Sequence, residues 1–139
     1  MYKLKRNESQ SNLDLENPII TCLMSVYNGD AFLREAIDSI LVQTFTNFEF
    51  LIINDCSTDN TVNIIESYND PRIRLIHNQV NIGLTKSLNL GINLAKGEFI
   101  ARMDADDICL PDRFQKQLNI VQYDDNLVSF GRFEVINEK

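Results

Sequence analysis

Short apolar runs, separated by longer stretches rich in polar residues, divide this chain into a regular series. Within the runs the apolar residues are nearly continuous rather than alternating, which is typical of strands that are covered on both faces of a sheet. We predict strands over residues 19–26, 48–53, 73–76, 99–103 and 127–130.

Between these runs, apolar residues recur at the spacing of one helical face. Leu33, Ala36, Ile37, Ile40 and Leu41 follow the i, i+3, i+4, i+7, i+8 pattern of an amphipathic helix. Three more helices are predicted, from residue 57 or 58 to the break at residues 70–71, over residues 84–95, and from residue 111 to residue 121. Alternating strands and helices form parallel βαβ units. The predicted fold class is therefore α/β, a Rossmann-like open and mostly parallel sheet with helices on both faces.

Residues between these elements predict where helices begin and end. We expect Asp30 to cap the first helix and Ser57 or Thr58 to cap the second. Gly97 is expected to end the third helix in a left-handed conformation. Residues 1–16 are polar with mixed charges, so we expect a disordered lead-in followed by one domain over residues 17–139.

The run at residues 99–103 leads directly into three acids, Asp104, Asp106 and Asp107. Crowded carboxylates raise one another's pKa, and a divalent cation removes that cost. Oxygen ligands suit Mg²⁺ or Mn²⁺, so Asp104 and Asp106 are candidate ligands of such a cofactor. Taken alone, the cluster fits a solvated acidic turn at least as well.

Polar residues also follow the other strands: Tyr27 and Asn28, Asn54 and Asp55, His77 and Asn78. The carboxyl ends of parallel strands meet at one edge of a sheet, where open α/β folds bind ligands. We therefore expect these residues and the three acids to converge. Four aligned polar ends favour a binding site over a set of unrelated turns.

Composition narrows the classes of protein. The chain has 139 residues and a net charge of −7, and phosphate-backbone recognition needs a basic surface, so nucleic acid is not an expected partner. Its three cysteines, Cys22, Cys56 and Cys109, match neither a disulfide framework nor a zinc spacing. We expect no signal peptide and no membrane span, and reduced thiols in a cytoplasmic protein. Peripheral attachment to the inner face of the membrane stays open.

With five glycines, the chain contains neither dinucleotide nor P-loop glycine fingerprint. A cation on Asp104 and Asp106 would replace the glycine cradle for a phosphate. Tyr27 could stack on a base or simply border the core, and Asp55 could accept a hydrogen bond from a ring N–H or serve a turn. Lys86 could reach a phosphate or be solvated. His77, the one histidine, is interpreted as structural.

Four motifs together resemble the family-2 glycosyltransferases of the GT-A fold. They lie at residues 24–29 (MSVYNG), 53–61 (INDCSTDNT), 81–84 (NIGL, followed by Ser87, Asn89 and Gly91) and 101–107 (ARMDADD). The resemblance covers the chain from about residue 18 to its end. It implies a metal-dependent and usually inverting transfer of a sugar from a nucleotide-diphosphate donor, commonly a UDP-sugar, to an acceptor hydroxyl.

The resemblance also implies roles for residues. Tyr27, Asn28 and Asp55 would hold the nucleobase end of the donor, with Asn81, Gly83 and Lys86 along the nucleotide pocket. Asp104 would lie near the ribose and the metal, and Asp106 would be the main metal ligand. A saccharide or lipid-linked acceptor, and a role in cell envelope polysaccharide biosynthesis, are further implications.

Two features depart from the family pattern. In the family, the catalytic base is a carboxylate that is supplied after the fifth strand. We therefore expect the base beyond Lys139 and regard the domain as truncated. Leu88 stands where relatives often carry arginine. We expect self-association through an uncovered sheet edge. The alternatives are a non-catalytic nucleotide- or metal-binding module, an inactive fragment, and a receiver-like domain, which needs a strand-end lysine that we do not find.

Overall fold

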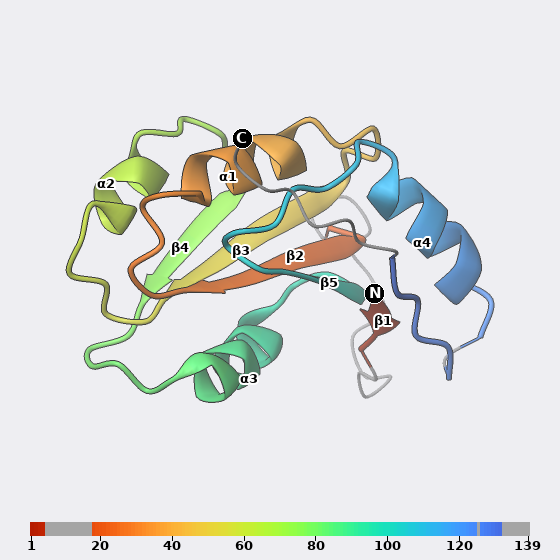
Figure 1. Ribbon diagram of the computed structural model, residues 1–139. Coiled ribbons are helices and arrows are strands. Elements are labelled where there is room, and N and C mark those ends of the chain that lie inside the picture. Colours follow the sequence, from red (N-terminus) through yellow and green to blue (C-terminus); the bar gives the residue numbers. More distant parts are fainter. Residues whose placement is uncertain (5–17, 125, 132–139) are drawn as a thin grey trace.

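The computed structural model describes residues 1–4, 18–124 and 126–131, which form one α/β unit (Figure 1). Five strands form one sheet in the order β1-β5-β2-β3-β4. Strands β2, β3, β4 and β5 are parallel to one another, and β1 pairs antiparallel with β5. The strands are β1 (Tyr2–Lys3), β2 (Ile20–Val26), β3 (Phe48–Asn54), β4 (Ile73–His77) and β5 (Phe99–Met103). The predicted fold class is confirmed.

Helices cover both faces of this sheet. Helices α1 (Leu33–Leu41), α2 (Thr61–Glu66) and α4 (Arg113–Val121) lie on one face, and α3 (Leu84–Leu94) lies on the other (Figure 1). Side chains alternate between the two faces, so Cys22 and Met24 of β2 pack under α1 whereas Leu23 packs under α3. No helix in the described part of the chain has the length and apolar character needed to cross a bilayer.

The start of the chain differs from its prediction. Tyr2 and Lys3 pair with Ile100 and Phe99 of β5, and Met1 is buried with its ammonium donating to the Ser129 carbonyl at 2.7 Å. Pairing with a distant strand orders these residues, although they carry no local pattern. The expected disordered lead-in is therefore wrong for residues 1–4, and residues 5–16 lie outside the described residues.

The strand predicted at residues 127–130 is also wrong. In this segment Val128 forms a single isolated bridge with Tyr2. The outer side of β5 is covered by β1, which pairs with Ile100 and Phe99. The segment stays at the surface, with Phe130 87% exposed. Residues 127–130 therefore offer no free strand edge for the predicted self-association.

Gly97 is required for close packing rather than for a left-handed turn. Its φ is not positive, and α3 ends at Leu94 with Ala95 as an extended C-cap, which corrects the predicted cap at Gly97. A Cβ added at Gly97 would lie 2.3 Å from the Thr21 backbone nitrogen. Only glycine lets the chain enter β5 this close to the start of β2.

Candidate functional site

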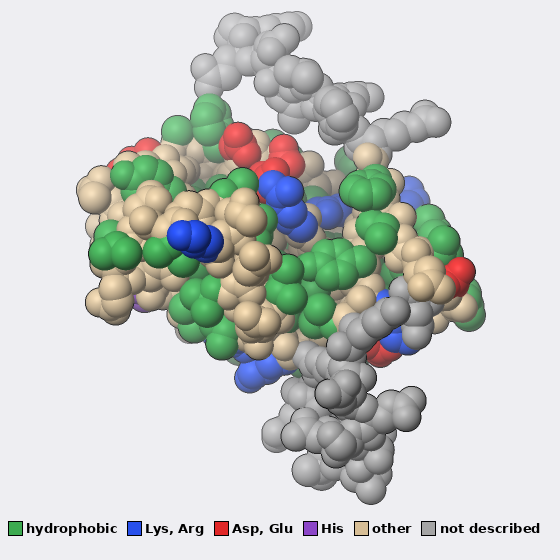
Figure 2. Space-filling view, turned by 90° about the horizontal axis from the view of Figure 1, so that it is seen from below, with side chains coloured by type: hydrophobic (Ala, Val, Ile, Leu, Met, Phe, Trp, Pro, Cys, Tyr) green, Lys and Arg blue, Asp and Glu red, His purple; other side chains and the backbone are tan. Residues whose placement is uncertain are grey.

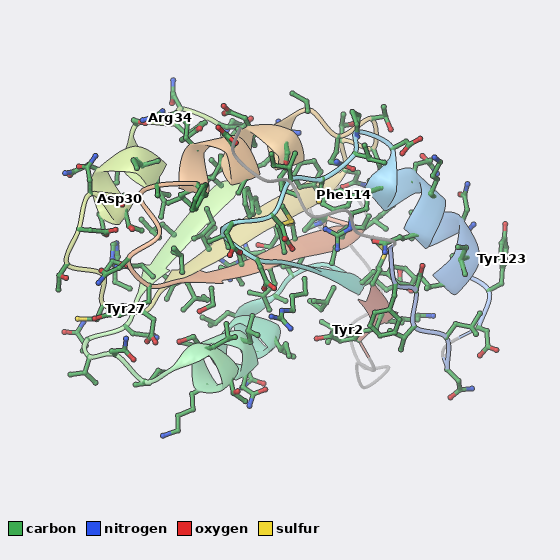
Figure 3. All side chains as sticks on the ribbon, viewed as in Figure 1. Tyr2, Tyr27, Asp30, Arg34, Phe114 and Tyr123 are labelled. Atoms are coloured by element: carbon green, nitrogen blue, oxygen red, sulfur yellow. The ribbon has the colours of Figure 1, made fainter. Side chains whose placement is uncertain are left out.

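The polar ends of the parallel strands meet at one edge of the sheet, as predicted. Val26 is in register with Asn54, and Asn54 with His77, so the loops that follow β2, β3 and β4 begin side by side. The end of β5 lies on the other side of β2, where Met103 is in register with Met24. Figure 3 shows Tyr27 at this carboxyl edge and Phe114 toward the opposite end of the sheet.

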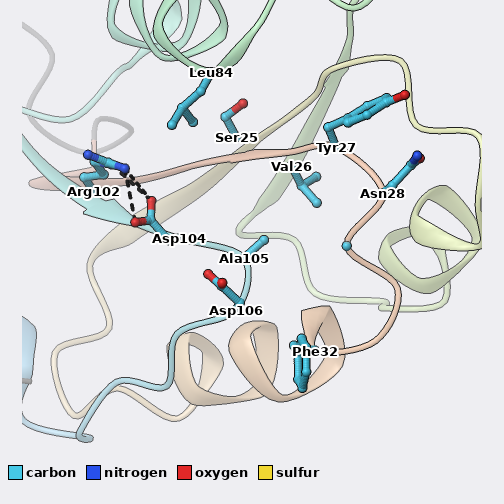
Figure 4. Close-up of a pocket in the computed structure, with 11 residues that line it drawn as sticks. Ser25, Val26, Tyr27, Asn28, Phe32, Leu84, Arg102, Asp104, Ala105 and Asp106 are labelled. Carbon is cyan, nitrogen blue, oxygen red and sulfur yellow. Dashed lines mark hydrogen bonds and ion pairs between the residues drawn. The ribbon is translucent and has the colours of Figure 1, made fainter. Parts of the chain in front are cut away.

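An open pocket of about 390 Å³ lies between the ends of β2 and β5 (Figure 4). It brings together four of the predicted site residues, Tyr27, Asn28, Asp104 and Asp106. The remaining residues that line it are Ser25, Val26, Gly29, Phe32, Leu84, Arg102 and Ala105. Asp55, Asn81, Gly83 and Lys86 do not line this pocket.

Hydrogen bonds between loops hold the β2 end of the pocket in place. Asn28 adopts a positive φ of 51°, its N–H donates to the Ser57 hydroxyl at 3.0 Å, and its side-chain oxygen accepts from the Thr58 N–H at 2.8 Å. The Gly29 N–H donates to the Thr61 hydroxyl at 2.9 Å. These bonds connect loops that are far apart in sequence and fix the backbone that carries Tyr27.

The residues expected to cap helices serve these contacts instead. The N-caps of α1 and α2 are Phe32 and Asn60, and neither side chain makes a capping hydrogen bond. The Asp30 N–H donates to Asp59 Oδ2 at 3.1 Å, which joins the loop after β2 to the loop after β3. The predicted caps at Asp30, Ser57 and Thr58 are therefore wrong, because both helices begin later in the chain, at Leu33 and Thr61.

Asp55 does not line the pocket but organises the loop that precedes α3. It is 2% exposed, and its carboxylate accepts from the Asn78 side chain at 2.7 Å and from the Ile82 and Gly83 N–H groups at 2.9 and 2.8 Å. Burial alone would raise the pKa of Asp55, but these hydrogen bonds, with one from Ser87, outweigh it and lower the pKa below its ordinary value. Asp55 is thus an ionised anchor for residues 78–83.

The loop that Asp55 anchors carries two further predicted residues. Asn81 is exposed, and Gly83 has a φ of 87° as it enters α3. Lys86, the third residue of α3, is exposed to solvent. His77 is exposed and its Nδ1 lies 3.2 Å from the Asn54 amide nitrogen. The structural interpretation of His77 agrees with this contact.

The acids after β5 have different surroundings. Asp104 is held by Arg102, whose guanidinium nitrogens lie 2.8 to 3.1 Å from its two carboxylate oxygens. Burial, followed by the charges of Asp104 and Asp106, raises the pKa of Asp107. Among the described residues, no three His, Cys, Asp or Glu side chains come close enough to hold a metal ion. The three acids therefore do not form one metal-binding group, and Asp107 lies outside the pocket.

Two protein carboxylates nevertheless fit one kind of cation. Mg²⁺ is usually held by one or two carboxylates together with substrate phosphates rather than by an all-protein cage. Asp104 and Asp106 line the same pocket, and both present oxygen donors to it (Figure 4). The donor set therefore suits a hard divalent cation that also needs oxygens from a ligand.

Arg102 is the pocket residue with clear chemistry that the sequence analysis did not select. It lies two residues before Asp104, so an extended strand places both side chains on the same face. A charge inside an otherwise apolar strand was the available signal. Phe32 and Leu84, which are 49% exposed at the start of α1 and α3, add apolar surface that no local pattern marks.

The fold and site together define an α/β domain with a ligand pocket at the carboxyl edge of a parallel sheet. The chain belongs to glycosyl transferase family 2, whose family model matches residues 21–139. An uncharacterized glycosyltransferase of Haemophilus influenzae is 38% identical over 129 residues, which are 90% of this chain and 40% of that protein. One of Rickettsia felis is 40% identical over 131 residues, 91% of this chain and 21% of that protein. The chain thus spans well under half the length of these relatives.

Solved structures show the same fold. Staphylococcus aureus TarS residues 1–349 in complex with UDP superposes with a TM-score of 0.66 at 29% identity, over 70% of this chain and 30% of that one. The Pyrobaculum calidifontis mannosyltransferase PcManGT, in complex with GDP-Man and Mn²⁺, superposes with a TM-score of 0.67 at 23% identity, over 75% of this chain and 32% of that one. The recognised GT-A fold is confirmed.

Proposed function

We propose that this chain binds the nucleotide-sugar donor of a glycosyltransferase and holds its diphosphate through a divalent cation on Asp104 and Asp106. The observation that carries the proposal is the single pocket that joins Tyr27 and Asn28, at the end of β2, to these two acids at the end of β5. An aromatic ring and a pair of carboxylates in one pocket suit the two ends of a nucleoside diphosphate.

The nucleoside end of the donor would lie against Tyr27. This side chain is 51% exposed, and its backbone is fixed by the bonds that Asn28 and Gly29 make, so its ring offers a preorganised face for stacking. We propose that Asp55 acts here by holding Asn81 and Gly83 at the border of the nucleotide. Lys86, on the exposed side of α3, is proposed as a more distant phosphate contact.

The diphosphate end would lie against Asp104 and Asp106. A cation bound there would stabilise the negative charge that develops on the departing nucleoside diphosphate. The protein's own contribution is to fix both acids directly after a buried strand whose Met103 is 2% exposed. The donor is proposed to be a UDP-sugar, because TarS, which is 29% identical, was solved with UDP and with UDP-GlcNAc.

Transfer itself needs an acceptor hydroxyl and a base. We propose an inverting reaction on a saccharide or lipid-linked acceptor, with the base supplied from outside the described residues. Asp107 is close to the site, but its side chain does not line the pocket. Donor binding is therefore the property of this chain to test first.

The test is calorimetric titration of UDP into the full chain with and without Mn²⁺. Asp106→Ala is expected to remove the Mn²⁺-dependent part of the affinity, because it deletes one of the two protein ligands. Asp30→Ala is the matched control, since Asp30 is also an exposed acid at this edge but does not line the pocket. Equal UDP affinity of wild type and Asp106→Ala in Mn²⁺ would refute the metal role.

A further inference from the structure

Arg102 binds the same carboxylate that the proposed cation would use. Its Nε lies 3.1 Å from Asp104 Oδ1, and its second terminal nitrogen lies 2.8 and 3.1 Å from the two oxygens of that carboxylate. The guanidinium therefore covers both oxygens at once (Figure 4). On the face that carries α3, acidic and basic side chains lie against one another at the surface (Figure 2).

The backbone of Arg102 is held in place, whereas its side chain can exchange its hydrogen-bond partner. Arg113 donates to the Arg102 carbonyl at 2.7 Å, and β5 pairs Arg102 with Leu23. The side chain is 51% exposed, and Asp104, at 46%, is the one carboxylate it bonds among the described residues. An exposed pair of this kind gains little energy and can exchange partners readily.

A guanidinium suits phosphate as well as it suits carboxylate, because its fork matches both pairs of oxygens. Arg102 and both acids line one pocket, so a diphosphate bridged to the acids by a cation would come within reach of this side chain. Once a cation takes Asp104, the guanidinium is left without its partner and beside another positive charge. Transfer of the fork to a phosphate oxygen resolves both problems.

We propose that Arg102 is an exchangeable counter-ion that couples cation binding to diphosphate binding. Without ligands it neutralises Asp104 and competes with the cation, and with both ligands present it bonds the diphosphate instead. The inference rests on the proposed function, and it adds a donor-binding residue and an order of events. The cation alone binds weakly, the diphosphate alone binds weakly, and each strengthens the other reciprocally.

Arg102→Gln separates the two effects in opposite directions. Without nucleotide, Mn²⁺ should bind about two- to fivefold more tightly, because a competitor worth no more than an exposed ion pair is removed. In saturating Mn²⁺, UDP should bind at least about tenfold more weakly, because a hydrogen-bonded charge on the phosphate is lost. Arg102→Lys, which keeps the charge without the fork, should lie between Gln and wild type in both measurements.

The free Mn²⁺ signal in electron paramagnetic resonance gives the first affinity, and calorimetry with UDP gives the second. Lys116→Gln is the control, because Lys116 pairs with Asp112 at 2.6 Å on the surface of α4 with both side chains exposed. It should change neither affinity. Circular dichroism of each variant confirms that the fold is retained.

The outcomes distinguish the two proposals. Tighter Mn²⁺ binding with weaker UDP binding in Arg102→Gln supports the exchange. If wild type shows Mn²⁺-dependent UDP binding but Arg102→Gln leaves both affinities unchanged, or weakens Mn²⁺ binding, the exchange is overturned and the proposed function stands. A wild-type chain that shows no Mn²⁺-dependent UDP binding overturns both.

Discussion

Two arginine–carboxylate pairs, at opposite edges of one sheet, have opposite surroundings. At the amino edge, Arg74 of β4 lies 2.8 Å from Glu49 of β3, with the two side chains 27% and 10% exposed. At the carboxyl edge, Arg102 and Asp104 are joined at the same distance of 2.8 Å but are 51% and 46% exposed. Distance alone therefore does not tell the two pairs apart.

Their partners do. Glu49 also accepts from the Thr21 hydroxyl at 2.6 Å and from the Lys96 N–H, and Arg74 also donates to the Leu94 carbonyl. This network joins β2, β3 and β4 to the end of α3. Asp104 shares no such network in the described chain beyond Arg102. A largely buried carboxylate with several partners fixes architecture, whereas an exposed pair whose side chains bond only each other among the described residues leaves both groups available for ligands.

Removing the carboxylate at each edge is the strongest test of this contrast. Glu49→Ala removes the carboxylate that Arg74 and the Thr21 hydroxyl share, and because Arg74 is partly exposed and keeps the Leu94 carbonyl, the cost should be about 3 kcal/mol, the lower end of the range for buried pairs. Asp104→Ala should cost less than about 1 kcal/mol, because water replaces the exposed partner. Urea unfolding of the two variants measures both. Equal losses of stability would contradict the contrast.

Asp55 is an intermediate case, a buried carboxylate at the binding edge that has no arginine. We expect Asp55→Asn to cost about 1.5–3 kcal/mol at neutral pH, because the N–H groups of Ile82 and Gly83 lose a charged acceptor. UDP binding should weaken with or without Mn²⁺, since the loop that borders the nucleotide loosens. Loss of only the Mn²⁺-dependent affinity would show that Asp55 belongs to the metal end.

The pH dependence of this variant has a definite sign. Hydrogen bonding lowers the folded-state pKa of Asp55, while the unfolded chain has a pKa of about 3.9. The carboxylate therefore stabilises the fold above that pH, and its contribution is lost as the pH falls through the lower, folded-state value. The stability gap between wild type and Asp55→Asn should narrow on acidification from pH 6, as measured by urea unfolding. A constant gap would contradict the shift.

Hydrophobic patterns in the sequence predicted two kinds of element: helices with one apolar face, and strands that are buried on both faces. The helical face at residues 33–41 became α1, and the continuous apolar runs became β2, β3 and β5. Strand β1 was missed because two residues carry no pattern and their pairing with β5 is a long-range event. Long-range pairing also decides the fate of residues 127–130. This run has a β-like pattern, but it forms a single bridge, between Val128 and Tyr2.

The site was predictable as far as the strand ends define it. Tyr27, Asn28, Asp104 and Asp106 share a pocket because parallel register places them together. The role of Asp55 as an anchor depends on Asn78 and Gly83, whose approach follows from tertiary packing. Sequence spacing reveals neighbours along a strand, but it does not reveal which backbone N–H groups fold back onto a carboxylate.

The smallest expected effect sharpens the contrast most directly. A double-mutant cycle of Arg102→Gln and Asp104→Asn, read by urea unfolding, should give a coupling of at most about 1 kcal/mol at low salt. At 1 M salt the Debye length is about 3 Å, comparable to the separation of the two exposed charges, so this coupling should fall clearly. The matching cycle of Arg74→Gln and Glu49→Gln should keep most of its coupling in salt, because Glu49 is largely shielded from solvent. A salt-resistant coupling between Arg102 and Asp104 would mean that the pair is a fixed structural element, and its exchange for a cation and a phosphate would then be disfavoured.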